Sequence, residues 1–250
     1  MELTGKNVLV VGLARSGMAA IKVLHRLGAV ITLSESKKKE DIKELPELEK
    51  LGVTVVDQSM QVFEGDYALV VKNPGVPFRS PMMQRLAERN IPVITEIELA
   101  YNVAKPQHYV AITGTNGKTT TSTLVYELLA KTFPGKTHLC GNIGIPLCET
   151  VLENGLMEEG GHYIALEISN FQLVNIDRFR PEAAVILNLT PDHVDFMGSL
   201  DAYYKSKTEV YRNMSGSDLF LLNADDPVLA EYTAKYPVTV SYTHLRAHET

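Results

Sequence analysis

Residues 109–120 read Tyr-Val-Ala-Ile-Thr-Gly-Thr-Asn-Gly-Lys-Thr-Thr, an apolar run followed by a glycine-rich turn. A helical pattern over residues 119–131 follows directly. A strand, a glycine-rich loop and a helix in this order form a phosphate-binding loop, in which backbone N–H groups and the positive end of the helix face phosphate oxygens. The order predicts an α/β domain that binds a nucleoside triphosphate.

The residue types in this loop have specific chemical uses. Gly114 and Gly117 let backbone N–H groups approach phosphate oxygens, because no Cβ stands in the way. The Lys118 ammonium can reach the outer phosphates and the Thr119 hydroxyl can ligate Mg²⁺. The usual loop has a further glycine where this chain has Ile112, and a simple glycine-rich turn is the alternative interpretation. We expect the nucleotide to contact Gly114, Thr115, Asn116, Gly117, Lys118, Thr119 and Thr120.

Composition restricts the class of protein. The 250 residues are 45% apolar and 22% charged, with a formal net charge of −6. These values are typical of a folded globular protein and argue against a nucleic-acid binder, which needs Lys and Arg to neutralise phosphates. No apolar stretch is long enough to cross a bilayer, and the N-terminus lacks a signal-peptide core. With only two cysteines, the chain is expected to be cytoplasmic and free of disulfides.

The first hundred residues alternate apolar runs with helical patterns. The continuous apolar run at 7–11 is typical of a strand that is covered on both faces. Ser80 is expected to cap a helix that has Pro81 at its first position. Alternation of this kind predicts a parallel, Rossmann-like sheet in a domain over residues 1–104. The further expected strands are 30–33, 53–56, 68–71 and 92–94.

The alternation breaks near residues 103–107, which predicts a domain boundary. A second α/β domain is expected over residues 105–240, with strands at 163–166, 183–187 and 219–222 and helices at 200–212 and 226–235. Residues 241–250 show neither a strand nor a helix pattern. We interpret them as a non-native tail on a truncated domain.

The first glycine turn, residues 12–17, is an incomplete dinucleotide-binding fingerprint, because Ala14 replaces the middle glycine. The start of the next helix still offers N–H donors to a phosphate, and Arg15 and Ser16 add side-chain donors. Glu35 lies about where a ribose-binding carboxylate is found. Plain packing of helix on sheet is an equally good interpretation of this turn. Residues 72–77 form another turn, which includes Asn73 and Gly75.

Polar residues follow several strands of the second domain. Glu167 ends an apolar strand, where a carboxylate suits Mg²⁺, although a solvent-exposed glutamate is the alternative. Asp192 and His193 follow another strand in the same way. The turn at 141–146 could bring Asn142 close to a ligand. From the residues alone, Lys205 and Lys207 are expected on a solvated cationic face of their helix.

Taken together, these segments resemble the Mur ligase family of ATP-dependent, amide-forming ligases in peptidoglycan precursor synthesis. The resemblance covers nearly the whole chain to about Val240. Among the members, the chain looks most like those that add D-glutamate to UDP-N-acetylmuramoyl-L-alanine. The matching segments are residues 113–120, 141–144, 166–172 and 188–193, together with Lys207.

The resemblance implies ATP and two Mg²⁺ ions as cofactors, with a catalytic set of Lys118, Glu167, His193 and Lys207. Thr119 and Glu167 would ligate the first Mg²⁺, and His193 and a carbamylated Lys207 the second. Carbamylation requires a neutral amine, so the resemblance implies that Lys207 is desolvated. The implied substrate-binding residues are Arg15, Ser16, Glu35, Asn73, Gly75, Asn142, Ser169 and Gln172. Where the family often has Asp after its second strand, this chain has Ser34 and Glu35.

The implied reaction has two steps. The substrate carboxylate attacks the γ-phosphate of ATP to give an acyl phosphate, and the D-glutamate amine then displaces phosphate. Family members carry a third, C-terminal domain that has no counterpart in this sequence. We therefore expect a monomer with a Rossmann-like domain and an incomplete P-loop-type domain, which binds nucleotide or UDP-sugar weakly and turns over poorly.

Three other functions are consistent with parts of the sequence. A folylpolyglutamate synthase-like ligase shares the phosphate loop, but is not expected to have a Rossmann-like domain before it. A NAD-dependent oxidoreductase would fit the first domain, but Ala14 and the second phosphate loop argue against it. A non-catalytic nucleotide-binding fragment is the third possibility.

Overall fold

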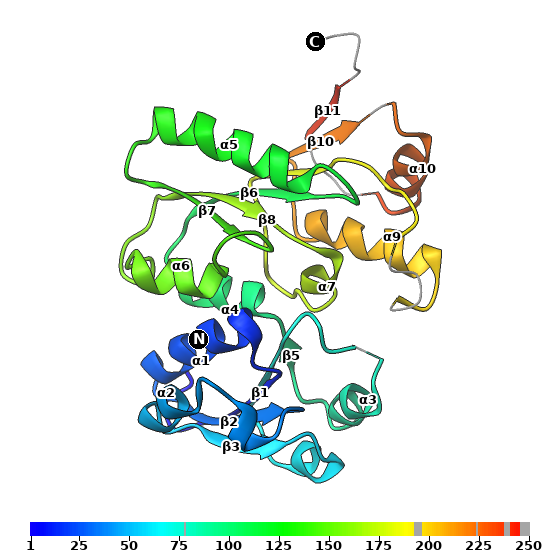
Figure 1. Ribbon diagram of the computed structural model, residues 1–250. Helices are drawn as coiled ribbons and strands as arrows, with labels where there is room; N and C mark the ends of the chain where they lie inside the picture. Colours follow the sequence, from blue (N-terminus) through cyan, green and yellow to red (C-terminus); the bar gives the residue numbers. More distant parts are fainter. Residues whose placement is uncertain (78, 193–196, 224, 238–240, 246–250) are drawn as a thin grey trace. The chain divides into compact units, whose positions relative to one another are not determined.

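A computed structural model of the chain describes residues 1–77, 79–192, 197–223, 225–237 and 241–245 (Figure 1). The chain forms two compact units, each built on its own parallel sheet. The first unit contains residues Met1–Val103 and Pro146–Asn154. The second contains Ala104–Ile145 and Gly155–Thr250. The α/β class with two parallel sheets agrees with the sequence prediction.

The sheet of the first unit has the order β3-β2-β1-β4-β5, and all its strand pairs are parallel. Four residues of β1 are buried, as expected for a strand with both faces covered. The chain extends to one side through β2 and β3, and then returns to place β4 on the other side of β1. The sheet therefore has a topological switch point between β1 and β4, where open α/β sheets bind ligands. The strands are β1 (Asn7–Val11), β2 (Val30–Glu35), β3 (Thr54–Asp57), β4 (Leu69–Lys72) and β5 (Val93–Ile94).

Helices and 3₁₀ turns connect these parallel strands. Ser80 caps α3 by accepting a hydrogen bond from the Met83 N–H, and Pro81 is the first residue of that helix, as predicted. Helix α6 (Leu147–Glu153) also belongs to the first unit, where it packs on α1 and α4. The other elements are α1 (Ala14–Arg26), η1 (Lys39–Asp41), α2 (Leu45–Lys50), η2 (Met60–Glu64), α3 (Pro81–Glu88) and α4 (Glu96–Val103).

The sheet of the second unit has the order β11-β10-β9-β6-β8-β7, and its strand pairs are also parallel. Its central strand, β6, precedes the phosphate loop. Alternate residues of β10 are buried, so this strand has one face on the core. The strands are β6 (His108–Thr113), β7 (Thr137–Gly141), β8 (Tyr163–Glu167), β9 (Ala183–Ile186), β10 (Leu219–Asn223) and β11 (Ser241–Leu245).

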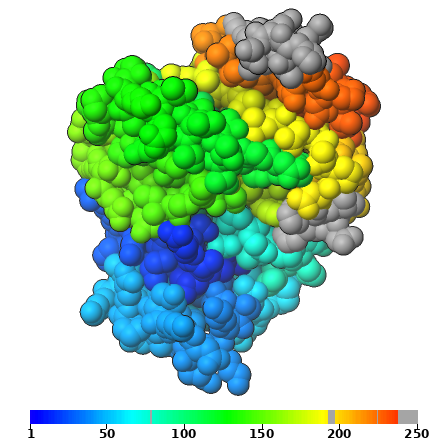
Figure 2. All heavy atoms as spheres, turned by 45° about the horizontal axis from the view of Figure 1, so that its top comes forward, coloured from blue at the N-terminus to red at the C-terminus, as the bar shows by residue number. Residues whose placement is uncertain are grey.

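Helix α5 (Lys118–Thr132) packs along β6, β8 and β7. In Figure 1 it lies above this sheet, whereas α7 (Asn170–Leu173) and α9 (Leu200–Thr208) lie below it. The outer side of α5 faces the viewer in Figure 2, and Leu124 and Leu128 are 59% and 66% exposed. The remaining helix is α10 (Pro227–Lys235), which Asp226 caps.

Two sequence expectations for the second unit need correction. The helix expected over 200–212 ends at Thr208 and continues only as a 3₁₀ turn, η3 (Glu209–Tyr211). Residues 241–245, expected to have no regular structure, form β11 and pair with β10. An edge strand gains backbone hydrogen bonds from its neighbour whatever its side-chain periodicity, which explains why the pattern did not predict it. Residues 246–250 of the expected tail lie outside the described residues.

Among the helices of the described residues, none combines the length and the apolar character that crossing a membrane requires.

Candidate functional site

The phosphate loop lies between β6 and α5, as the sequence predicted. Gly114 has a φ of +144° and Gly117 a φ of +81°, a region that glycine adopts without a steric cost. A Cβ on Gly114 would lie 3.1 Å from the Cβ of Leu187, at the end of the neighbouring strand. The tight fit of the loop against that strand therefore requires glycine at position 114.

Backbone and side-chain hydrogen bonds hold the loop against the segment after β9. The Asn116 N–H donates to Oδ1 of Asn188 at 2.9 Å, and Nδ2 of Asn188 donates back to the Asn116 carbonyl at 3.0 Å. The Thr190 N–H donates to Oγ1 of Thr115 at 3.1 Å. These bonds fix the shape of the loop against the segment after β9.

Two lysine ammonium groups converge on one carbonyl of this loop. Nζ of Lys118 donates to the Gly114 oxygen at 3.0 Å and to the Thr115 oxygen at 2.8 Å. Nζ of Lys207, from α9, donates to the same Gly114 oxygen at 3.0 Å. The expectation of a solvated face is therefore wrong for Lys207, which is 1% exposed, but holds for the exposed Lys205. Periodicity alone could not reveal that the loop covers Lys207.

The electrostatic surroundings of Lys207 favour a neutral amine. Burial, reinforced by the nearby charge of Lys118 and opposed by Asp192, lowers the pKa of Lys207 to about 7. The ammonium also lies 4.6 Å from the ring centroid of Tyr203. The Tyr203 hydroxyl in turn lies 3.2 Å from Oγ1 of Thr115. The sequence did not indicate Tyr203 by residue type, but its position one helical turn before Lys207 predicts that the two side chains are neighbours.

The carboxylate at the end of β8 faces the start of α5. Glu167 is 2% exposed, so the exposed-glutamate alternative is wrong. Oγ1 of Thr119 donates to its Oε2 at 2.9 Å, and Nδ2 of Asn142 donates to its Oε1 at 2.8 Å. A Cβ on Gly141 would lie 2.2 Å from the Glu167 carbonyl oxygen, which explains the glycine before Asn142. Asn142 and Glu167 thus meet beside the start of α5, and their predicted contacts with a ligand stay predictions.

These groups suit a hard cation. Mg²⁺ prefers oxygen ligands and keeps several waters, and the Thr119 hydroxyl beside the Glu167 carboxylate offers such oxygens. The described residues contain no group of three or more His, Cys, Asp and Glu side chains that could hold a metal ion. His193, the other expected metal ligand, lies outside the described residues.

Ser169 and Gln172, the other expected substrate-binding residues of this unit, bond to each other. They form a capping box at the start of α7, in which the Ser169 N–H donates to Oε1 of Gln172 at 2.9 Å. Both are largely buried. The arrangement positions the α7 turn just after Glu167, and their contact with substrate stays a prediction.

The first unit places its candidate residues around the Gly12 turn. Gly12 has a φ of +82°, and a Cβ there would lie 3.1 Å from the Cβ of Asn73. Oε2 of Glu35 accepts the Leu13 N–H at 2.7 Å, and its Oε1 accepts the N–H groups of Ser36 and Lys37. Burial acts to raise the pKa of Glu35, but these donors outweigh it and the pKa is lowered. The carboxylate thus supports the turn, and its predicted contact with a ribose stays untested.

The turn after β4 is bonded to the same region. Nδ2 of Asn73 donates to Oγ of Ser16 at 2.9 Å, and Oδ1 of Asn73 accepts the Gly75 N–H at 2.9 Å. The structure therefore brings Ser16, Asn73 and Gly75 together. This arrangement is needed if the three residues bind one substrate, which stays a prediction.

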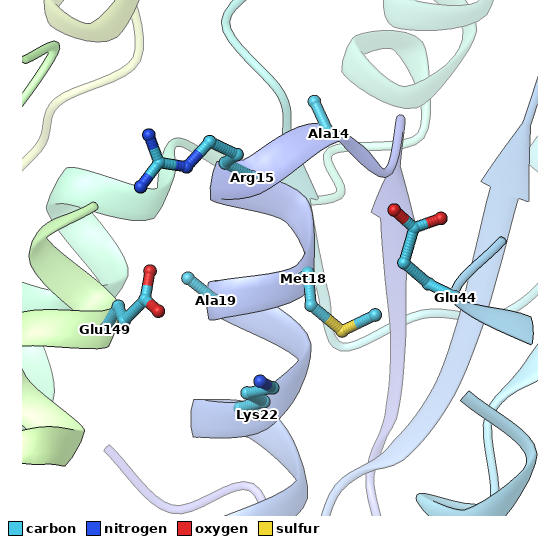
Figure 3. A pocket seen from close by; sticks show the side chains of 7 residues that line it. All are labelled: Ala14, Arg15, Met18, Ala19, Lys22, Glu44 and Glu149. Atoms are coloured by element: carbon cyan, nitrogen blue, oxygen red, sulfur yellow. The ribbon is translucent and has the colours of Figure 1, made fainter. Parts of the chain in front are cut away.

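Arg15 points into a pocket of about 210 Å³ along α1 (Figure 3). Arg15 and Lys22 supply its cationic groups, and Glu44 and Glu149 supply carboxylates, the latter from α6. Ala14, Met18 and Ala19 form its apolar lining. Arg15 thus lines a hollow of the first unit, and its predicted contact with substrate stays a prediction.

Comparisons with known proteins agree on one family. The Mur ligase MurD-like N-terminal domain matches residues 6–95, and the Mur ligase middle domain matches residues 112–249. A UDP-N-acetylmuramoylalanine--D-glutamate ligase of Geobacillus sp. (strain WCH70) is 40% identical over 228 residues, which are 90% of this chain and 49% of that protein. The ligase of the same name from Enterococcus hirae is 42% identical over 238 residues, 94% of this chain and 51% of that protein.

The chain spans about half the length of the curated relatives it matches. Among solved structures, the UDP-N-acetylmuramate:L-alanyl-gamma-D-glutamyl-meso-diaminopimelate ligase from Neisseria meningitides has a TM-score of 0.59. It is 17% identical, and the match covers 96% of this chain and 78% of that one. At this identity the likeness concerns the fold.

Proposed function

This chain belongs to the Mur ligase family, and on that premise we propose that it forms the ATP- and sugar-nucleotide-binding part of a ligase that joins D-glutamate to UDP-N-acetylmuramoyl-L-alanine. Two relatives that carry this activity in their names support the choice of substrate. The match of residues 6–95 to a MurD-like domain favours it over a folylpolyglutamate synthase-like ligase. We place the reaction in the cytoplasm, catalysed by a monomer.

One observation carries the proposal: the Thr119 hydroxyl and the Glu167 carboxylate lie 2.9 Å apart beside the phosphate loop. In a phosphate loop, the residue after the lysine and a carboxylate at a neighbouring strand end hold Mg²⁺. Lys118 is the residue that would then turn from the loop carbonyls to the β- and γ-phosphates. Mg²⁺, when bound, would offset the charge of the triphosphate and the substrate carboxylate.

We assign Lys207 to a second metal position as a carbamate, together with His193. A carbamate forms when a neutral amine adds CO₂ and loses a proton. Burial and the neighbouring Lys118 lower the pKa of Lys207 to about 7, so a substantial neutral fraction exists at neutral pH. The hydrogen bond from Lys207 to the Gly114 carbonyl holds its Nζ at the loop.

The residues of the chain have separate tasks in the proposed reaction. The loop N–H groups and Lys118 bind and orient the triphosphate, so that the substrate carboxylate attacks the γ-phosphate in line. Asn142 holds Glu167 in place through its 2.8 Å hydrogen bond. The D-glutamate amine then attacks the acyl carbon, and phosphate leaves. In the first unit, Arg15, Ser16, Asn73 and Gly75 are assigned to the uridine diphosphate.

Calorimetric titration of the chain with an ATP analogue, with and without Mg²⁺, tests the nucleotide part. We expect Mg²⁺-dependent binding that Lys118→Met weakens by at least about tenfold, because a charge-assisted contact to phosphate is lost. Glu167→Gln is expected to weaken binding only when Mg²⁺ is present. Lys131→Met, an exposed lysine at the other end of α5, is the matched control. Equal affinity of the Lys118 variant and the wild type would contradict the assignment.

The substrate part needs a separate measurement. We expect calorimetry to show that the chain binds UDP-N-acetylmuramoyl-L-alanine more tightly than a folate substrate. Tighter binding of the folate substrate would overturn the proposed substrate while leaving the nucleotide site intact.

A further inference from the structure

Lys72 is a buried cation at the topological switch point of the first sheet. It is the last residue of β4, aligned with Val11 of β1 just before the Gly12 turn. Its side chain is among the largest fully buried ones, with 2% exposure. A lysine in this position is unusual, because strands covered on both faces normally carry apolar residues.

The Lys72 ammonium closes the turn that follows it. Nζ donates to the Asn73 carbonyl at 3.1 Å and to the Val76 carbonyl at 2.8 Å. The same turn packs against Gly12, where an added Cβ would lie 3.2 Å from Cγ2 of Val76. Movement of the Lys72 side chain would therefore displace the turn relative to the glycine turn of β1.

In the part of the chain that the structure describes, no opposite charge is paired with Lys72. Both its hydrogen-bond acceptors are neutral carbonyls, and among the described residues no carboxylate forms an ion pair with it. Burial lowers its pKa to about 8, so it is mainly charged at neutral pH. A buried charge costs free energy unless a partner offsets it. An anionic ligand at the switch point would offset this charge through space, without a contact to the ammonium.

We propose that Lys72 is a positioning residue for a diphosphate-bearing ligand of the first unit. Its ammonium holds the Asn73–Val76 turn against the Gly12 turn, and its unbalanced charge favours the anion that binds beside them. The inference rests on the proposed sugar-nucleotide function and adds to it a residue that acts through the turn, without touching the ligand.

The test compares calorimetric affinities of the whole chain for UDP and for inorganic pyrophosphate at pH 7. Lys72→Met removes the charge and both hydrogen bonds that Nζ donates, whereas Lys72→Arg keeps a charge and N–H donors. Lys50→Met, an exposed lysine at the end of α2, changes the net charge equally. Far-UV circular dichroism and thermal unfolding check that every variant is folded. We expect Lys72→Met to weaken both ligands by about tenfold or more, and Lys72→Arg and Lys50→Met to stay within about threefold of the wild type.

The two ligands separate this inference from the proposed function. Loss of pyrophosphate binding in folded Lys72→Met supports the role of Lys72, whether or not the wild type binds UDP. A wild type that binds pyrophosphate but not UDP would contradict only the sugar-nucleotide proposal. Equal affinities of folded Lys72→Met and the wild type would overturn the role of Lys72 and leave the proposed function standing. A wild type that binds neither ligand overturns both. If Lys72→Met does not fold, Lys72→Arg decides. An affinity more than about threefold weaker than that of the wild type overturns the positioning role, and an affinity within about threefold supports it.

Discussion

The replacement Glu96→Gln tests how α6 is held in the first unit. Glu96 is the first residue of α4 and is 2% exposed. Its Oε1 accepts the N–H of Cys148 at the start of α6, while its Oε2 has no hydrogen-bond partner among the described residues. The carboxylate therefore caps a helix from a distant part of the sequence, but half of its hydrogen-bonding capacity is unused. The neutral form should fit this environment better than the charged form.

The pH dependence has a definite sign. Burial, partly offset by the N–H donors of α6, raises the pKa of Glu96 from 4.5 to about 7. The native state then binds a proton more tightly than the unfolded state, so the contribution to stability is full below about pH 4.5 and is lost as the pH rises through about 7. The shift corresponds to at most about 3 kcal/mol of unfolding free energy at pH 8. Glu96→Gln stays neutral, and should be more stable than the wild type at pH 8 and similar at pH 4.5.

Hydrogen exchange of the α6 amides, residues 147–153, between pH 5 and pH 8 measures the effect locally, after correction for the intrinsic exchange rate. We expect protection of α6 to fall with pH in the wild type and to remain level in Glu96→Gln. Glu153→Gln, an exposed carboxylate on α6 itself, is the matched control and should follow the wild type. Urea unfolding followed by circular dichroism gives the global free energy. The same pH dependence in the wild type and Glu96→Gln would refute the reasoning.

Three further changes probe the second unit. Gly141→Ala places a methyl 2.2 Å from the Glu167 carbonyl oxygen, at a backbone φ of +108°. We expect the unfolding free energy to fall by about 2–4 kcal/mol, measured by thermal unfolding, and an unchanged melting temperature would contradict the geometry. Asp226→Ala removes the acceptor of three backbone N–H groups, including that of Leu189, and should cost about 1–2 kcal/mol in urea unfolding, with Asp226→Asn recovering most of it. With ¹³CO₂, the NMR spectrum of the chain should show a carbamate carbon resonance that grows as the pH rises through about 7, because Lys207 then becomes neutral. The resonance should be absent in Lys207→Arg, and a resonance that persists in that variant would exclude Lys207 as the modified group.

Much of the fold was predictable because its signals are local. The strand, loop and helix around Gly114 and Lys118 lie in one continuous stretch, and backbone sterics allow few residues other than glycine at such turns. The same holds for the cap at Ser80 and for the apolar run of β1, which show a helix start and a strand covered on both faces. The alternation of strands and helices then predicted parallel sheets, but it contained no information on strand order.

Part of the candidate site was predictable from chemistry at strand ends. Glu167 ends an apolar strand of a predicted parallel sheet, and ligands gather at such strand ends. The strand before Asn142, β7, and its place beside β8 came only from the structure. The expectation for Lys207 shows the limit of this reasoning. Its helix looks cationic in sequence, yet packing against the phosphate loop buries it completely.

The sequence by itself determined where the phosphate loop lies, because such a loop is recognised from adjacent residues. Only the tertiary structure decided the electrostatic state of the lysines and glutamates. Lys72, Glu96 and Lys207 owe their shifted pKa values to burial by segments far away in the chain. Desolvation depends on everything that surrounds a charge, and that environment exists only once the chain has folded.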